Sequence, residues 1–311
     1  MSLIDRMSDY FGLRESELAR LIKSAPLRYK VYRIPKKREG EFRIIAQPSK
    51  EVKALQYWMI DNMLKDLPVH PCALAYKKGA SIKKNALAHS NNNFLLKVDF
   101  ADFFPSIKPE DLWAYLERNH PNSFTQEDFN FASYILFWSP KHVRKGGLQL
   151  SIGAPSSPLI SNLVMFDFDC EAAKVAMEYE AQYTRYADDL AFSTNKPYSL
   201  NKIYESIENI CKGLTHPKLT INTSKTVFSS KKNRRRITGL IVTNEGNVSL
   251  GRERKRMIRT TIDHYGKGKL STEQKLNLQG LLAFAIDVEP NFIETMEKKY
   301  SKELIDSILH P

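Results

Sequence analysis

Cysteine is scarce in this sequence, with 3 residues in 311, and Cys72, Cys170 and Cys211 lie far apart. They show none of the short cysteine and histidine spacings that are typical of zinc sites. We therefore expect neither a zinc site nor a disulfide framework. The three thiols are expected to be reduced and buried, in a cytoplasmic protein.

Long apolar runs are also missing. No segment approaches the roughly 20 apolar residues that a membrane helix requires, so we expect no membrane partner. Charged residues interrupt the apolar positions of the first 25 residues, which is not the pattern of a signal-peptide core. Internal repeats and low-complexity segments are absent as well. A chain of 311 residues can hold one to three compact units.

Acidic residues are in the minority, with 35 Asp and Glu against 47 Lys and Arg, which gives a net charge of +12. Neutralisation of phosphates is the main sequence-independent source of nucleic-acid affinity, so this excess indicates a polyanionic partner. The charge is clustered, which favours a binding face over general solubility. The two densest clusters are Lys231, Lys232, Arg234, Arg235 and Arg236, and Arg252, Arg254, Lys255, Arg256 and Arg259.

Two adjacent aspartates, Asp188 and Asp189, stand between runs rich in β-branched and aromatic residues within residues 183–194. This pattern predicts a tight hairpin that presents both carboxylates at its turn. Two anions held this close repel each other unless a cation lies between them. Magnesium is the expected ion, because it prefers carboxylate oxygens and keeps positions open for water and phosphate.

A third carboxylate is expected from another strand. The apolar run at residues 94–98 ends in Asp99, and Pro105 follows shortly after, where it would end the strand. Asp99 is therefore the predicted partner of the Asp188–Asp189 pair.

The strand ending in Asp99, the Gly-Ala-Pro-Ser-Ser-Pro stretch at residues 153–158 and Tyr-Ala-Asp-Asp at residues 186–189 follow one another like the motifs of a template-directed polymerase palm. From about residue 28 to 258 the chain resembles reverse transcriptases, and more narrowly those of bacterial retrons. The resemblance implies an α+β right-hand polymerase with an antiparallel palm sheet. It places an N-terminal helix and fingers at residues 1–98, the palm with remaining fingers elements at 99–248, and a helical thumb at 249–311.

The resemblance also implies RNA-templated DNA synthesis with two Mg²⁺ ions about 4 Å apart. Asp99, Asp188 and Asp189 would bind them, with Phe100 in the same metal-binding set. Lys225 occupies the position of a lysine that can protonate the leaving pyrophosphate.

Incoming nucleotide contacts are expected from the fingers. A basic hairpin is predicted from strands at residues 29–34 and 41–46, and the resemblance assigns phosphate contacts to Arg43 and to one of Lys36 or Lys37, with Lys37 the chosen candidate. An exposed hairpin with solvated charges is the alternative.

Phe104 matches the aromatic residue that lies under the sugar and selects deoxynucleotides, although Phe103 beside it could be the buried ring or the gate. Gly153 and Ala154 are predicted to give a backbone room to approach a base pair. Many relatives have Pro-Gln-Gly where this chain has Ser-Ile-Gly at residues 151–153, so a side-chain amide is missing there.

RNA contacts are implied in two places. Retron enzymes carry the Asn-Ala-x-x-His segment found here at Asn85 and His89, and a Val-Thr-Gly segment that here reads Ile-Thr-Gly at residues 237–239. The full predicted RNA-binding set is Asn85, His89, Arg234, Arg235, Arg236, Thr238, Gly239, Arg252, Arg254, Lys255 and Arg259.

Apolar periodicity predicts helices at residues 16–23, 48–67, 109–120, 126–138, 161–177, 252–265, 272–284 and 291–308. The last three would form the thumb, and the first of them is basic on much of its surface.

Similarity to retron enzymes further implies a structured noncoding RNA that serves as template and primer. Synthesis would start from a 2′-hydroxyl and give a branched RNA–DNA hybrid (msDNA), in antiphage defence with a separately encoded effector protein. Two rivals remain: an intron-type reverse transcriptase, and a basic RNA-binding scaffold that keeps the palm without turnover. The missing C-terminal extension disfavours the first, and the presence of all three aspartates disfavours the second.

Overall fold

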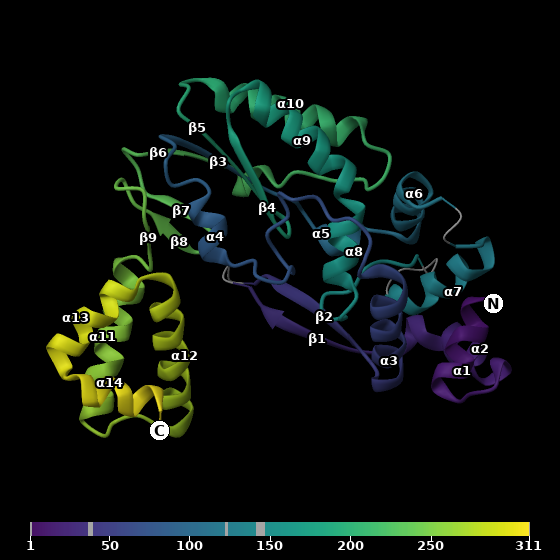
Figure 1. Cartoon of the computed structure of the whole chain (residues 1–311), viewed down its shortest axis with the longest axis horizontal. Coiled ribbons are helices and arrows are strands. Elements are labelled where there is room, and N and C mark those ends of the chain that lie inside the picture. Colours follow the sequence, from purple (N-terminus) through teal and green to yellow (C-terminus); the bar gives the residue numbers. More distant parts are fainter. Residues whose placement is uncertain (1, 37–39, 122–123, 141–146, 311) are drawn as a thin grey trace.

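A four-stranded antiparallel sheet forms the centre of the molecule (Figure 1). The structure is a computed structural model that describes residues 2–36, 40–121, 124–140 and 147–310. The sheet order is β4-β5-β3-β6. Its strands are β3 (Phe94–Asp99), β4 (Gln182–Tyr186), β5 (Asp189–Thr194) and β6 (Val227–Ser230), the last preceded by the short helix η3 (Thr223–Lys225).

The two faces of this sheet differ in chemistry because side chains alternate along each strand. On β3, Leu96 and Val98 point into the main hydrophobic core. Lys97 and Asp99 point to the other face, as period two requires. Figure 1 shows α9 (Phe166–Glu178) and α10 (Ser199–Gly213) over the apolar face. The candidate site lies at one end of the opposite face, whose Leu95 and Ala191 pack in a second hydrophobic core.

The helix predicted at residues 161–177 is two helices. The first is α8 (Ser157–Val164), which has Pro158 in its first turn, as the prolines of this stretch predict, and Met165 then separates α8 from α9. Met165 has φ −82° and ψ 0°, which departs from regular helix geometry. The prediction of one continuous helix was wrong. The bend at Met165 does not interrupt the spacing of the apolar residues, so the sequence pattern gives no sign of it.

Further helices extend the main core away from the sheet. The predicted helices at residues 16–23, 48–67, 109–120 and 126–138 are all present. The first helix, α1, has no predicted counterpart; Ser2 and Asp5 form its capping box. The remaining elements of this part are α1 (Leu3–Phe11), α2 (Glu15–Ser24), η1 (Ala25–Leu27), α3 (Lys50–Met59), η2 (Ile60–Leu64), α5 (Phe103–Ser106), α6 (Pro109–Asn119) and α7 (Gln126–Leu136).

The predicted fingers hairpin is also present, as β1 (Tyr29–Pro35) paired antiparallel with β2 (Phe42–Pro48). Its connection includes Lys37, which lies outside the described residues. The Ala46 N–H donates to the Ile152 carbonyl at 3.0 Å, which ties the hairpin to the segment that precedes α8.

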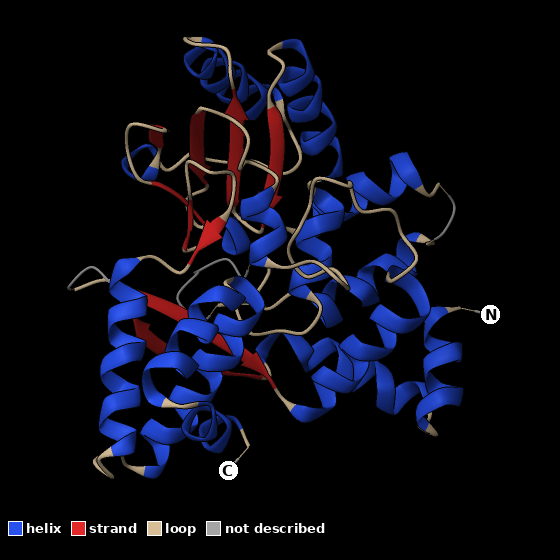
Figure 2. Ribbon diagram, turned by 60° about the vertical axis from the view of Figure 1, so that its left-hand side comes forward, coloured by secondary structure: helices blue, strands red, loops and turns tan. Residues whose placement is uncertain are grey.

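A second hydrophobic core joins the C-terminal helices to a small sheet and to α4 (Ile82–Leu87). The sheet has the order β7-β8-β9. Figure 2 shows the helices as a compact bundle beside it. The strands and helices are β7 (Arg235–Ile237), β8 (Leu240–Val242), β9 (Val248–Ser249), α11 (Arg252–Gly266), α12 (Thr272–Val288), α13 (Pro290–Tyr300) and α14 (Lys302–Leu309).

The predicted helix at residues 291–308 is interrupted. Ser301 has φ +83°, and its hydroxyl accepts the Leu304 N–H at 3.3 Å as the N-cap of α14. The bundle therefore has four helices where three were predicted. None of the helices in the described ranges combines the length and hydropathy needed to cross a bilayer.

Candidate active site

The three predicted aspartates meet at one end of the central sheet. Asp188 lies in the turn between β4 and β5, and Asp189 begins β5. Asp189 is paired in register with Asp99 at the end of β3. The Phe100 N–H donates to the Asp188 carbonyl at 3.3 Å, which fixes the turn against β3. The predicted hairpin, with its carboxylates at the turn, is confirmed.

These carboxylates repel one another at a partly buried site, where Asp99 is buried and Asp188 and Asp189 are half-buried. Burial, with the neighbouring charges of Asp189 and Asp99, raises the pKa of Asp188 to about 6. Burial also raises the pKa of Asp189, although Lys97 opposes the shift. A partly buried group of carboxylates with an excess of negative charge is a suitable donor set for a hard divalent cation.

Two lysines pair with the carboxylates. The Lys225 Nζ donates to Asp99 Oδ1 at 2.8 Å, and this hydrogen bond raises the pKa of Lys225. The Lys97 Nζ lies 3.7 Å from Asp189 Oδ1. Lys225 is thus at the site, as predicted. Lys97 was missed, although its spacing of two from Asp99 on a strand places both on one face.

A cavity of about 360 Å³ lies between the fingers and the start of α8, and Phe104 and Ala154 line it. Phe103 is instead in the hydrophobic core at 3% exposure, stacked on Phe100. The structure therefore distinguishes the two rings: Phe104 faces the cavity and Phe103 does not. Arg43 is exposed on β2. The other residues around the cavity are Lys53, Tyr57, Tyr76, Ser151, Ile152, Gly153, Pro155, Ser157 and Pro158.

Gly153 is needed for a reason different from the predicted one. A Cβ at this position would lie 3.1 Å from Ile45 Cγ2 and 3.2 Å from the Ala46 oxygen, and its φ is +124°. The close approach is to β2, so the room at Gly153 is already used by the fingers hairpin. The Ser151 hydroxyl strengthens the same contact by donating to the Ala46 carbonyl at 2.6 Å.

Asn85 and His89 belong to a buried hydrogen-bond network, each with 1% exposure. The two ring nitrogens of His89 lie 2.7 Å from Ser193 Oγ and 2.7 Å from Thr184 Oγ1, and Thr184 donates to Asn85 at 2.6 Å. Burial lowers the pKa of His89 to about 3, so the ring is neutral. The prediction that these two side chains contact RNA is wrong for this arrangement, because they join α4 to the sheet and offer no surface.

The predicted basic residues divide into exposed and inward-facing groups. Arg235 is 1% exposed and donates to the carbonyls of Asn92 and Thr243, so it is a structural residue and its predicted RNA contact is also wrong. Lys255 pairs with Glu289, and the Arg254 guanidinium stacks on Phe284; both are half-buried. The exposed members of the predicted RNA-binding set are Arg234, Arg236, Arg252 and Arg259, and Arg256 of the same basic helix is exposed as well.

The exposed arginines come from two segments that lie together. Glu253 of α11 is 3.5 Å from Arg234 and 3.9 Å from Arg236 of β7, which brings strand and helix side by side. Thr238 and Gly239 form the turn between β7 and β8 with φ of +44° and +84°. Two consecutive residues with positive φ are typical of a tight hairpin turn, which accounts for the glycine.

Comparison with known proteins agrees with this geometry. The sequence profile of the family described as reverse transcriptase (RNA-dependent DNA polymerase) matches residues 34–242. The chain is 42% identical over 289 residues to the retron Ec83 reverse transcriptase of Escherichia coli, covering 93% of this chain and 92% of that protein. It is 34% identical over 279 residues to the retron Ec73 reverse transcriptase of the same species, covering 86% of each. The chain is a member of the retron reverse transcriptases.

Its activity is RNA-directed DNA polymerisation, and the predicted α+β right-hand polymerase fold is confirmed. Among solved structures, apo telomerase from Candida tropicalis aligns with a TM-score of 0.51 at 13% identity, over 91% of this chain and 60% of that one. At this identity the likeness concerns the fold alone.

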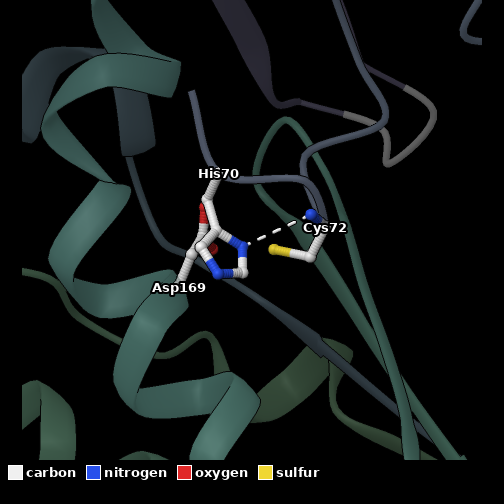
Figure 3. A group of neighbouring side chains, drawn as sticks. All are labelled: His70, Cys72 and Asp169. Carbon is white, nitrogen blue, oxygen red and sulfur yellow. Dashed lines mark hydrogen bonds between the residues drawn. The ribbon is translucent and has the colours of Figure 1, made fainter. Parts of the chain in front are cut away.

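A second group of possible metal ligands in this reverse transcriptase lies below the sheet. Ligand atoms of His70, Cys72 and Asp169 lie within 4.8 Å of one another (Figure 3). Both oxygens of Asp169 already accept hydrogen bonds from Arg185. Burial raises the pKa of the Cys72 thiol, which keeps it protonated. A guanidinium on the carboxylate and a protonated thiol make this a hydrogen-bonded core and a poor cation site.

Proposed function

We propose that this retron reverse transcriptase binds two Mg²⁺ ions through Asp99, Asp188 and Asp189, with Phe100 in the same set. The observation that carries the proposal is the register that pairs Asp99 with Asp189 beside the Asp188 turn. When bound, the ions would activate the primer hydroxyl and stabilise the leaving pyrophosphate. Lys225, held against Asp99, is the proposed acid that protonates the pyrophosphate.

The cavity beside the fingers is the proposed site of the incoming deoxynucleotide. Phe104 would exclude a 2′-hydroxyl, since its ring faces this space, and Ala154 would lie against the base pair. Arg43 is proposed to bind the triphosphate, which its exposed position on β2 permits.

The exposed arginines of β7 and α11 are the proposed RNA-binding surface, which we call the arginine surface (Arg234, Arg236, Arg252, Arg256 and Arg259). We keep the division into fingers at residues 1–98, palm at 99–248 and thumb at 249–311 as a proposal, in which β3 (Phe94–Asp99) of the central sheet crosses the first boundary. The second hydrophobic core crosses the last of these boundaries, because β7 and β8 pack with the thumb helices. The arginine surface would therefore move with the thumb.

We further propose that a structured noncoding RNA is both template and primer, and that a 2′-hydroxyl starts synthesis to give a branched RNA–DNA hybrid. A separately encoded effector in antiphage defence completes the proposal, in the cytoplasm, where the free cysteines would stay reduced. These finer assignments follow the retron relatives, whose similarity extends over most of the chain.

The experiment incubates the purified protein with its retron RNA, Mg²⁺ and labelled dNTPs, and then analyses the product's 5′ end. A 2′-hydroxyl that attacks a dNTP makes a 2′,5′ phosphodiester, so a debranching enzyme should release the DNA from ribonuclease-treated product. DNA that extends an RNA 3′ end and resists debranching would contradict the proposal. An unrelated RNA with a preannealed primer serves as control, because it should be extended without a branch.

A further inference from the structure

Arg185 lies directly below the catalytic turn, on the opposite face of the sheet from the aspartates. Along β4, Thr184 points toward α4, where it bonds Asn85. Its neighbours Tyr183 and Arg185 point the other way, toward Asp169 of α9. Arg185 therefore cannot touch substrate or metal, and any effect on chemistry must pass through the turn itself.

The guanidinium of Arg185 is fully buried, and each of its three nitrogens donates a hydrogen bond. Its Nε donates to Asp169 Oδ1 at 2.8 Å, and its Nη2 donates to Asp169 Oδ2 at 2.7 Å. Neither side chain has any exposed surface. The Tyr183 hydroxyl adds a further bond to Asp169 at 2.8 Å. This forked pairing fixes the orientation of the guanidinium plane.

The remaining nitrogen faces the catalytic turn. Arg185 Nη1 donates to the Ala187 carbonyl at 3.2 Å and to Asn162 Oδ1 at 3.1 Å. Ala187 directly precedes Asp188 and has φ +59°, a left-handed conformation that residues with a Cβ rarely adopt. Asn162, through its Nδ2, also donates to the Ala75 carbonyl at 3.0 Å, beside the nucleotide cavity. One guanidinium thus fastens a strained turn to α8 and α9.

We propose that Arg185 is a positioning residue for DNA synthesis: paired with Asp169, it holds the Ala187 carbonyl and thereby the orientation of the Asp188 and Asp189 carboxylates. This inference rests on the proposed role of those aspartates as metal ligands. Only a planar fork can pair with Asp169 on one edge while a third nitrogen reaches the turn. A lysine at this position would keep the ion pair with Asp169 and lose the hydrogen bond to the Ala187 carbonyl.

Two variants separate positioning from stability. Arg185→Lys keeps the charge, and the double variant Arg185→Leu with Asp169→Leu removes both charges together, which buried ion pairs often tolerate. We measure thermal unfolding, single-turnover incorporation on a preannealed primer–template, and Mn²⁺ binding to the protein alone by electron paramagnetic resonance. We expect a folded protein, roughly a 10²-fold slower incorporation at saturating dNTP and clearly weaker Mn²⁺ binding.

Incorporation and Mn²⁺ binding within twofold of wild type in either folded variant would overturn the proposal. The matched control is Arg118→Gln, on α6. It breaks the ion pair between Arg118 and Asp167, which is on α9 like Asp169, and it should change neither readout. If both Arg185 variants fail to fold, Asn162→Ala is tested with the same readouts. This variant removes the hydrogen bond between Asn162 and Arg185 Nη1 and keeps the ion pair between Arg185 and Asp169.

Asp188→Asn is measured alongside as a reference. An active Asp188→Asn protein would mean that the metal assignment itself fails. An inactive Asp188→Asn protein together with normal Arg185→Lys incorporation would mean that only the positioning role fails.

Discussion

Aspartates on the two faces of the palm sheet have opposite surroundings. Below the sheet, Asp169 has no exposed surface and its charge is matched by the Arg185 fork. Above it, Asp188 has two carboxylate neighbours, which with burial raise its pKa to about 6. Three carboxylates face two lysines there, so negative charge is in excess on this face, and a cation is to be sought where such an excess remains. The difference teaches that the balance of charge around a carboxylate separates a structural aspartate from a functional one.

The largest expected effect comes from the face with the excess of negative charge. Asp188→Asn removes a ligand charge with almost no change of shape, so we expect synthesis to fall by roughly 10³-fold or more, equivalent to about 4 kcal/mol of transition-state stabilisation. RNA binding should stay near wild type, and the protein should remain folded. Primer extension with Mg²⁺ measures synthesis, RNA titration measures binding, and thermal unfolding shows whether the variant is folded. Near-normal incorporation would remove Asp188 from the metal site.

Phe104 is next in expected size. Phe104→Ala should admit ribonucleotides, because the smaller side chain relieves the clash with the 2′-hydroxyl. We expect discrimination between dNTP and NTP to fall by roughly 10- to 100-fold in a direct competition. Phe103→Leu is the matched control, since that ring is in the core and its change should lower stability while selectivity persists. Unchanged selectivity in Phe104→Ala would mean that another residue is the gate.

The arginine surface should contribute affinity without chemistry. Replacing Arg252, Arg256 and Arg259 by glutamine should weaken RNA binding and reduce the slope of log affinity against log salt by about 2, at about 0.7 for each single-strand phosphate contact. Incorporation from a bound primer should change little. The charge-matched control replaces three exposed lysines elsewhere on the thumb, Lys269, Lys298 and Lys302. Equal loss in both triple variants would mean that only net charge matters.

The smallest effect concerns stability. The pKa of Asp188 in the folded state is about 6, above the ordinary 3.8. Above pH 6 the ionised Asp188 carboxylate therefore destabilises the folded state, and as the pH falls the folded state takes up a proton before the unfolded state does. Without divalent metal, Asp188→Asn should therefore be more stable than wild type at pH 7 by about 1–3 kcal/mol. This difference should disappear as the pH falls from about 6 toward 4. Denaturant unfolding at several pH values checks it, and a constant difference would contradict the charge account.

Local patterns sufficed for much of the fold and for the centre of the site. The alternation of apolar and polar residues predicted the strands of the fingers hairpin, and aspartates next to predicted strands predicted the Asp188–Asp189 hairpin and Asp99. These features could be predicted because strand periodicity and turn preference depend on neighbouring residues. Burial of polar residues depends on distant segments. His89 is buried because Ser193 and Thr184 surround it, which no local pattern indicates. The same holds for Arg235 and for the close approach of β2 to Gly153.

The most direct test of the account is where a divalent cation binds. Anomalous diffraction from crystals of the protein soaked in Mn²⁺ should show density between Asp99 and Asp188, with no peak at His70, Cys72 and Asp169. Asp188→Asn crystals serve as the control and should lose that density. Density at Asp169 with Arg185 displaced, and none at Asp188, would contradict the assignment of the two faces.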